Sequence, residues 1–123
     1  MKRMRRLRVN EVIRSMVRET SLHKLDLVYP IFIIQVEGIK NPVPSMPGIF
    51  QYSIDCVDEE IERIVSAGIG SILVFGIPGH KDEVGSQAYA EEGITQRAIR
   101  YIKEKEPNLV IIADVCLCEY TSH

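Results

Sequence analysis

The last ten residues hold the densest group of reactive side chains in the sequence, with Asp114, Cys116, Cys118 and His123 all in this stretch. Thiolates and imidazole are ligands that suit zinc, so a Cys-x-Cys pair with a nearby histidine is typical of a metal site. Two protein ligands hold zinc poorly, because catalytic zinc usually has three. A third ligand would come from His123, Asp114 or residues past the end of the printed sequence.

A second interpretation of these cysteines needs no metal. Free cysteine is among the residues most often buried, and Cys116 and Cys118 would then be ordinary thiols in a half-buried turn. Cys56 has no Cys or His neighbour, and we expect it to act as a small apolar residue. Three unevenly spaced cysteines form no disulfide framework, which favours a reducing, cytoplasmic setting.

Three buried strands are predicted to position the reactive residues. They correspond to near-continuous apolar runs at 27–34, 71–75 and 109–113, separated by segments with helical spacing. Alternation of this kind predicts an α/β fold, with a parallel sheet covered by helices. Asp114 would then follow the last strand, and α/β folds carry their sites at the carboxyl ends of such strands.

Each segment between the strands has start and stop signals of a helix. Asp55 is predicted to cap the first helix and Gly68 to end it, while Thr95 caps the second and Pro107 stops it. The apolar faces of these two helices are expected to be buried; they comprise Val57, Ile61, Ile64, Val65, Ala98, Ile99 and Ile102.

The other segments are predicted to be a basic arm, a short helix and loops. Residues 1–8 are basic, and Asn10 is placed to cap a short helix after them. Residues 41–48 contain three prolines, which argues against helix or regular strand there. Residues 76–93 are expected to form a long polar loop.

Composition limits the class of protein. The 123 residues carry 15 basic and 17 acidic side chains, and this formal net charge of −2 argues against a nucleic-acid binder. The apolar content of 46% is typical of a globular domain, and no apolar run approaches the ~20 residues of a membrane span. No apolar signal segment follows the basic N-terminus. We therefore expect a cytoplasmic protein with neither nucleic-acid nor membrane partners.

The sequence closely resembles the delta-aminolevulinic acid dehydratase family, also called porphobilinogen synthases. The resemblance runs the whole length of the chain and is most specific in its last ten residues. In the family a short Gly-His-Cys-Gly or Gly-His-Asp-Gly segment follows that motif. The matching residues are 3–8, 14, 16–19, 27–30, 44–48, 75–78, 81–82, 85–86, 96–100, 114–118 and 120–123.

The resemblance implies a TIM barrel whose N-terminal arm embraces a neighbouring subunit, usually in a homo-octamer. Residues 1–26 would be the arm with its helix, and residues 27–123 the first part of the barrel. A barrel needs eight strands over about 250 residues, and about three of the eight are predicted here. Three strands with two helices would also leave much apolar surface exposed. Both arguments predict the N-terminal part of a longer protein.

The family's reaction condenses two molecules of 5-aminolevulinate to porphobilinogen with loss of water. This is an early step of tetrapyrrole biosynthesis, which leads to heme, siroheme and corrinoids. Two lysines form Schiff bases with the substrates, as lysines do when burial or a neighbouring cation lowers their pKa. By the resemblance both lysines fall beyond His123, so we expect this chain alone to be inactive.

The resemblance also implies roles for the residues near the end of the chain. Cys116 and Cys118 match the first two of three cysteines that bind a catalytic zinc, and the third would lie beyond His123. Members with Asp or Ala at these positions depend on magnesium or potassium, so the two cysteines indicate the zinc type. Asp114 matches a carboxylate that faces the substrate amine. A Mg²⁺ site, if the protein has one, would lie outside this chain.

Two alternatives stay open from the sequence. One is a non-catalytic α/β module, complete at this length, that uses its thiols or binds a metal. The other is a different TIM-barrel lyase that works through a Schiff base, because fold alone does not determine function. A Gly-His-Cys-Gly segment after His123, followed by two buried lysines, would favour the dehydratase over both.

Overall fold

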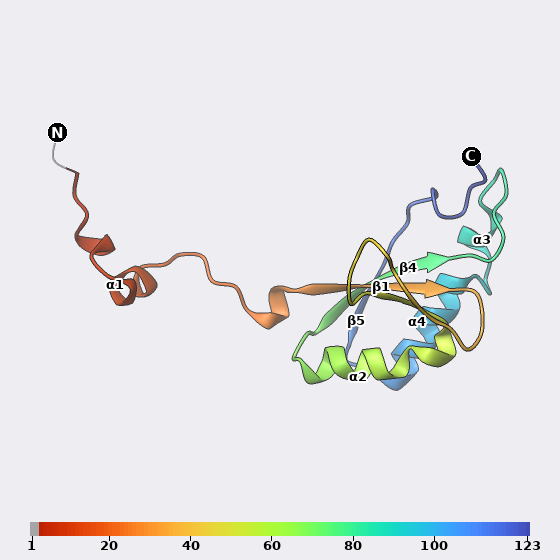
Figure 1. Cartoon of the computed structure of the whole chain (residues 1–123), viewed down its shortest axis with the longest axis horizontal. Coiled ribbons are helices and arrows are strands. Elements are labelled where there is room, and N and C mark those ends of the chain that lie inside the picture. Colours follow the sequence, from red (N-terminus) through yellow and green to blue (C-terminus); the bar gives the residue numbers. More distant parts are fainter. Residues whose placement is uncertain (1–2) are drawn as a thin grey trace.

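The computed structural model describes residues 3–123, so Met1 and Lys2 of the expected basic arm lie outside the described residues. An N-terminal arm extends away from an α/β body (Figure 1). The side chain of Asn10 accepts a hydrogen bond from the Ile13 N–H at 2.9 Å, which confirms the predicted cap. The arm contains a 3-10 turn at Arg6–Arg8, helix α1 at Glu11–Met16 and a second 3-10 turn at Lys24–Asp26.

A five-stranded sheet with the order β2-β3-β1-β4-β5 forms the centre of the body. Strands β3, β1, β4 and β5 are parallel neighbours, while β2 pairs antiparallel with β3 at one edge. The predicted parallel sheet is confirmed, with β2 and β3 added to the three predicted strands. The bounds are Val28–Ile34 for β1, Lys40–Pro42 for β2, Phe50–Tyr52 for β3, Ser71–Ile77 for β4 and Val110–Ala113 for β5.

The predictions for two loops need correction. Asn41 and Pro42 belong to β2, although the three prolines of residues 41–48 argued against a strand. An edge strand has one side without a ladder partner, so it tolerates a residue that has no N–H. The loop predicted at 76–93 begins inside β4 and contains the one-turn helix α3 (Ser86–Tyr89).

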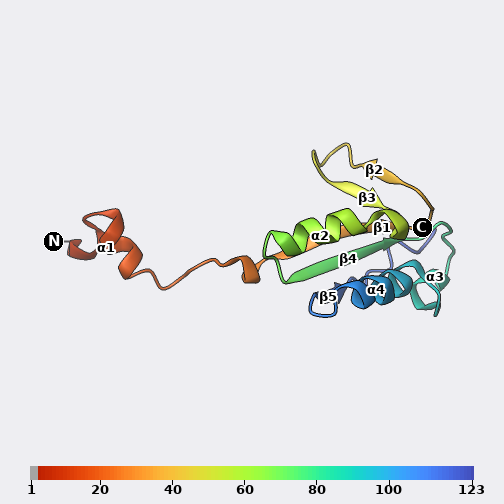
Figure 2. The same cartoon turned by 90° about the horizontal axis from the view of Figure 1, so that it is seen from below.

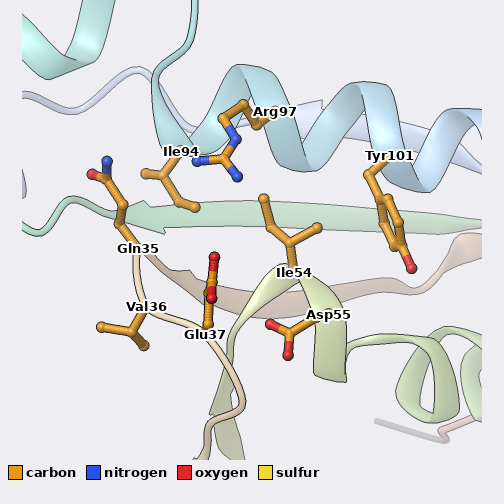
Figure 3. A pocket seen from close by; sticks show the side chains of 8 residues that line it. All are labelled: Gln35, Val36, Glu37, Ile54, Asp55, Ile94, Arg97 and Tyr101. Carbon is orange, nitrogen blue, oxygen red and sulfur yellow. The ribbon is translucent and has the colours of Figure 1, made fainter.

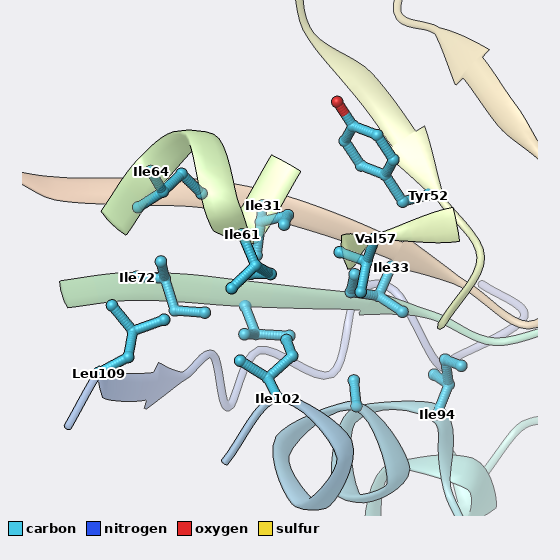
Figure 4. Packing of buried hydrophobic residues seen from close by; sticks show 12 residues of the cluster. Ile31, Ile33, Tyr52, Val57, Ile61, Ile64, Ile72, Ile94, Ile102 and Leu109 are labelled. Atoms are coloured by element: carbon cyan, nitrogen blue, oxygen red, sulfur yellow. The ribbon is translucent and has the colours of Figure 1, made fainter. Parts of the chain in front are cut away.

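Helices α2 (Asp58–Ser66) and α4 (Ile94–Lys105) lie along the same face of the sheet (Figure 2). The apolar side chains of both helices pack on alternate residues of β1 and β4, which point toward them (Figure 4). Val65 was expected in this layer but is 39% exposed on the outer side of α2. The buried cluster comprises Ile31, Ile33, Tyr52, Val57, Ile61, Ile64, Ile72, Val74, Ile94, Ala98, Ile102 and Leu109.

The opposite face of the sheet is apolar, and no helix of the described residues covers it. Phe32 of β1 stacks on Phe75 of β4 with ring centroids 5.3 Å apart. On β5 the side chains of Val110 and Ile112 are 55% and 42% exposed. Every strand was predicted to be buried on both faces, and this is wrong for the uncovered face, where the side chains of β1 and β4 are mostly only partly buried and those of β5 are the most exposed.

Two predicted helix caps are wrong. Asp55 lies in a 3-10 turn before α2, and its carboxylate accepts a hydrogen bond from the Gly38 N–H at 2.8 Å. The residue in the N-cap position of α2 is Val57. Helix α4 begins two residues earlier than expected, at Ile94 after Gly93, so Thr95 lies inside its first turn. Both polar side chains bond to residues far away in the sequence instead of to their own helix.

Glu60 is a buried carboxylate on α2, only 5% exposed, that the sequence analysis did not single out. It accepts hydrogen bonds from the hydroxyls of Tyr29 at 2.6 Å and Tyr52 at 3.0 Å, and from Arg63 at 2.5 Å. Burial acts to raise the pKa of Glu60, but the bonds from Arg63 and the two tyrosines outweigh it, and the pKa falls below its usual value. The ionised carboxylate therefore connects α2 to β1 and β3.

Replacing Glu60 with Ala is expected to lower the free energy of unfolding by about 2 kcal/mol, because three donors lose their charged acceptor. The exposed Glu62 on the same helix is the matched control, and Glu62→Ala should change stability little. The folded pKa of Glu60 lies below its unfolded value of about 4.3, so its contribution is present above that pH and is lost as the pH falls further. In urea unfolding, a Glu60→Ala effect undiminished at pH 3 would contradict this assignment.

Candidate active site

Asp114 lies at the edge of the sheet where the parallel strands β1, β4 and β5 end. Its backbone N–H donates to the Val74 carbonyl at 3.2 Å, which extends the pairing of β5 with β4. The side chain is half-buried. The structure thus confirms that Asp114 follows a parallel strand, while its chemical role stays a prediction.

Cys116 and Cys118 lie together on the segment after β5. Both thiols are free and exposed, and their sulfur atoms are 2.7 Å apart. The hydrogen bond with Cys116 raises the pKa of Cys118 above its usual value. Two thiolates on one tetrahedral zinc have sulfurs about 3.8 Å apart, a separation that small side-chain rotations would reach from here. The pair therefore fits as two ligands of one soft metal ion.

The surroundings of the two thiols are acidic. Burial raises the pKa of Glu119, and the neighbouring charge of Asp114 raises it further, while Lys81 acts in the opposite direction. Asp114 and Glu119 also contribute to the raised pKa of Cys118. Negative groups crowded in this way favour a cation among them.

No third ligand joins the two cysteines within residues 3–123, where no group of three His, Cys, Asp or Glu side chains is arranged to hold a metal. The sequence left His123 and Asp114 open as third ligands, and neither completes the pair in this structure. Cys56 lies elsewhere, with its sulfur 3.6 Å from the Asp55 carboxylate. It is half-buried and belongs to no candidate site.

The thiol segment is held at its far end by residues that the sequence analysis did not assign to the site. Tyr120 is 5% exposed, and its hydroxyl lies 2.7 Å from the Thr95 hydroxyl on α4. The Asp82 N–H donates to the Tyr120 carbonyl at 3.3 Å, and the Ser122 N–H donates to the Asp82 carbonyl at 3.0 Å. The signal available in the sequence was an aromatic residue two positions after the Cys-x-Cys pair.

Two cavities adjoin this end of the sheet. The smaller, of about 310 Å³, lies between α4 and the segment after β5, and Asp114 and Cys116 line it. The larger, of about 490 Å³, lies between the segment after β1 and α4, where Glu37 and Arg97 face each other (Figure 3). None of the predicted site residues lines the larger cavity. The geometry therefore associates the predicted site with the smaller one.

A family model for delta-aminolevulinic acid dehydratase matches residues 1–123. The chain belongs to this family. A delta-aminolevulinic acid dehydratase of Halalkalibacterium halodurans is 56% identical over 122 residues, which cover 99% of this chain and 37% of the relative. The dehydratase of Bacillus subtilis is 51% identical over 122 residues, covering 98% of this chain and 37% of the relative. The chain thus spans about 37% of the length of these dehydratases.

The fold agrees with that of a solved delta-aminolevulinic acid dehydratase. The Toxoplasma gondii enzyme, in complex with the reaction product porphobilinogen, superposes with a TM-score of 0.90 and 32% sequence identity. The match covers 99% of this chain and 35% of that one. The dehydratase fold is a TIM barrel, and the sheet described above is its N-terminal part, as predicted. Among the described helices, none has the length and apolar character needed to span a membrane.

Proposed function

We propose that this chain is the N-terminal part of an enzyme that condenses two molecules of 5-aminolevulinate to porphobilinogen with loss of water. The observation that carries the proposal is the match of the whole chain to the dehydratase family. The Toxoplasma gondii relative, bound to porphobilinogen, supports the same product for this protein. The longer protein that carries this chain is called the whole enzyme below, and we place it in the tetrapyrrole pathway of the cytoplasm.

In this enzyme Asp114 binds the amino group of one substrate. The half-buried carboxylate follows β5 at the edge where the parallel strands end, the position from which TIM barrels present their catalytic groups. The negative charge there would hold an ammonium group or accept a proton from it. Asp114 thereby orients the amine relative to the two lysines that form Schiff bases, which we place outside this chain.

Cys116 and Cys118 would hold a zinc ion in the whole enzyme. The fit rests on two exposed thiols with adjacent sulfurs in acidic surroundings, a soft ligand set that favours zinc over magnesium. A third cysteine from outside this chain would complete the ligands. Bound zinc supplies a Lewis acid that polarises a substrate oxygen.

The N-terminal arm would assemble the whole enzyme into a homo-oligomer, which we propose is an octamer. The arm carries apolar side chains that nothing else in the described chain covers, and it extends away from the body (Figure 1). The most exposed are Met4 at 80%, Met16 at 79% and Leu22 at 77%. The mass of the whole enzyme in solution is the measurement that bears on this assembly.

Replacing Asp114 with Asn in the whole enzyme is expected to lower kcat by about 100-fold and to raise KM, because the amide neither holds a charged amine nor accepts its proton. Porphobilinogen formation is followed colorimetrically with a benzaldehyde reagent. Glu104→Gln, at an exposed position of α4, is the matched control and should leave both constants unchanged. Wild-type enzyme that forms no porphobilinogen would refute the proposed function, and an unaffected Asp114→Asn variant would refute the role of Asp114.

A further inference from the structure

Tyr120 is the buried residue of a segment whose other residues are exposed or half-buried. After β5 the chain leaves Val115 89% exposed and Leu117 52% exposed, and both nearby thiols face solvent. Tyr120 is only 5% exposed and packs between β4 and α4. Its hydroxyl lies 2.7 Å from the hydroxyl of Thr95, which is itself 7% exposed in the first turn of α4.

The hydrogen-bonded pair lies directly against Gly76 near the end of β4. A Cβ atom at this position would lie 1.9 Å from the Thr95 hydroxyl and 2.9 Å from the Tyr120 hydroxyl. Any side chain larger than a hydrogen would push the two hydroxyls off the strand. Gly76, Thr95 and Tyr120 therefore form one buried contact that joins β4, α4 and the segment after β5; we call it the tyrosine clamp.

The tyrosine clamp fixes one end of the thiol segment, and the sheet fixes the other. At the first end, the Asp114 N–H bonds to β4 through the Val74 carbonyl. At the second end, the N–H groups of Tyr120 and Thr121 both donate to the Leu117 carbonyl, at 2.9 Å and 3.0 Å, and close a tight turn. Cys116 lies between the two anchors and Cys118 lies inside the turn.

We infer that Tyr120 and Thr95 are positioning residues that set the separation of the Cys116 and Cys118 sulfurs and the direction of Asp114. The inference rests on the proposed function, because it assigns the clamp to the metal and substrate groups of that same site. The physical reason is that a metal ion tolerates little error in ligand position, and residues that orient its ligands typically change affinity by about 10- to 100-fold when they are replaced.

The test compares variants of the whole enzyme by their affinity for Zn²⁺, measured in competition with a chromophoric chelator. Co²⁺ substitution adds a thiolate-to-metal absorption band that reports the geometry of the cysteines. We expect Tyr120→Phe and Thr95→Val each to weaken Zn²⁺ binding by about 10-fold and to shift the Co²⁺ band. Thr95→Ser keeps the hydroxyl and should restore both readouts. The double variant should bind Zn²⁺ no more weakly than either single variant, because both substitutions remove the same hydrogen bond.

Tyr101→Phe is the matched control. Tyr101 also belongs to α4, and its hydroxyl donates to the Asp58 carboxylate at 3.0 Å, away from the thiols. A purely structural role for Tyr120 would make both tyrosine variants less stable with unchanged Zn²⁺ affinity and Co²⁺ band, and that result overturns the inference. If Tyr120→Phe does not fold, the inference is tested by comparing the Zn²⁺ affinity and Co²⁺ band of Thr95→Val with those of Thr95→Ser. A wild-type enzyme that binds no Zn²⁺ through its cysteines refutes the proposed metal site itself. This outcome differs from one in which the wild type binds Zn²⁺ and the variants bind it equally well, which refutes only the positioning role.

Discussion

The 123-residue chain by itself is expected to form no porphobilinogen from 5-aminolevulinate. The proposed reaction needs two lysines with lowered pKa values, which burial or a neighbouring cation produces. Every lysine within residues 3–123 is exposed. Lys105 lies against the Asp58 carboxylate, and this hydrogen bond raises its pKa, the direction opposite to that of a nucleophilic amine. The described lysines therefore lack the environment that Schiff-base formation requires.

Borohydride trapping tests for the Schiff bases directly, without relying on turnover. The chain and the whole enzyme are each incubated with 5-aminolevulinate and sodium borohydride, and the reduced adducts are located by mass spectrometry. The whole enzyme should carry its adducts on lysines outside residues 1–123, and the chain should carry none. Porphobilinogen formed by the purified chain, or a specific adduct on Lys81 or another of its lysines, would show that the catalytic lysines have been placed wrongly.

The parallel sheet was predictable because its signal is local. Strands β1, β4 and β5 are runs of apolar residues too short for helices, and the amphipathic segments between them became α2 and α4. Strands β2 and β3 have three residues each and too little pattern to be recognised. Their existence depends on pairing with each other and with β1, which is a tertiary property.

The two helix caps were predicted wrongly because tertiary contacts, which also determine β2 and β3, outweigh the local capping rule. Asp55 and Thr95 are residue types that cap helices, and each precedes an apolar helical face, so the local rule applied to both. In the fold Asp55 bonds to the backbone of Gly38, and Thr95 turns inward to Tyr120 because Gly76 leaves space for it. A hydrogen bond between residues so distant in the sequence leaves no periodic signal.

The burial of Glu60 could not be predicted from the apolar pattern of α2 either. On a helical projection it borders the apolar stripe of α2, and a carboxylate at such a position is ordinarily solvated. Its burial depends on donors from two strands, Tyr29 of β1 and Tyr52 of β3, and the second strand was not predicted. For the candidate site the sequence identified the residues and their place at a strand end, because spacing and strand order are local. It did not identify the contacts that hold them.

Replacing either Cys116 or Cys118 with Ala in the whole enzyme is expected to remove the zinc ion and to lower the rate of porphobilinogen formation by about 10-fold or more. The two sulfurs are adjacent in the structure, so one metal ion can contact both, and losing either leaves too few thiolates to retain it. Zinc per subunit is measured by atomic emission spectroscopy after gel filtration, beside the initial rate.

Cys56→Ala is the control that separates loss of a site from loss of any thiol. Cys56 is free like the other two cysteines, but it is half-buried beside Asp55 and lies apart from the pair. Its replacement should leave zinc content and rate unchanged, because no metal ligand is removed. Equal zinc content and equal rates in all three variants and the wild type would instead make Cys116 and Cys118 ordinary exposed thiols.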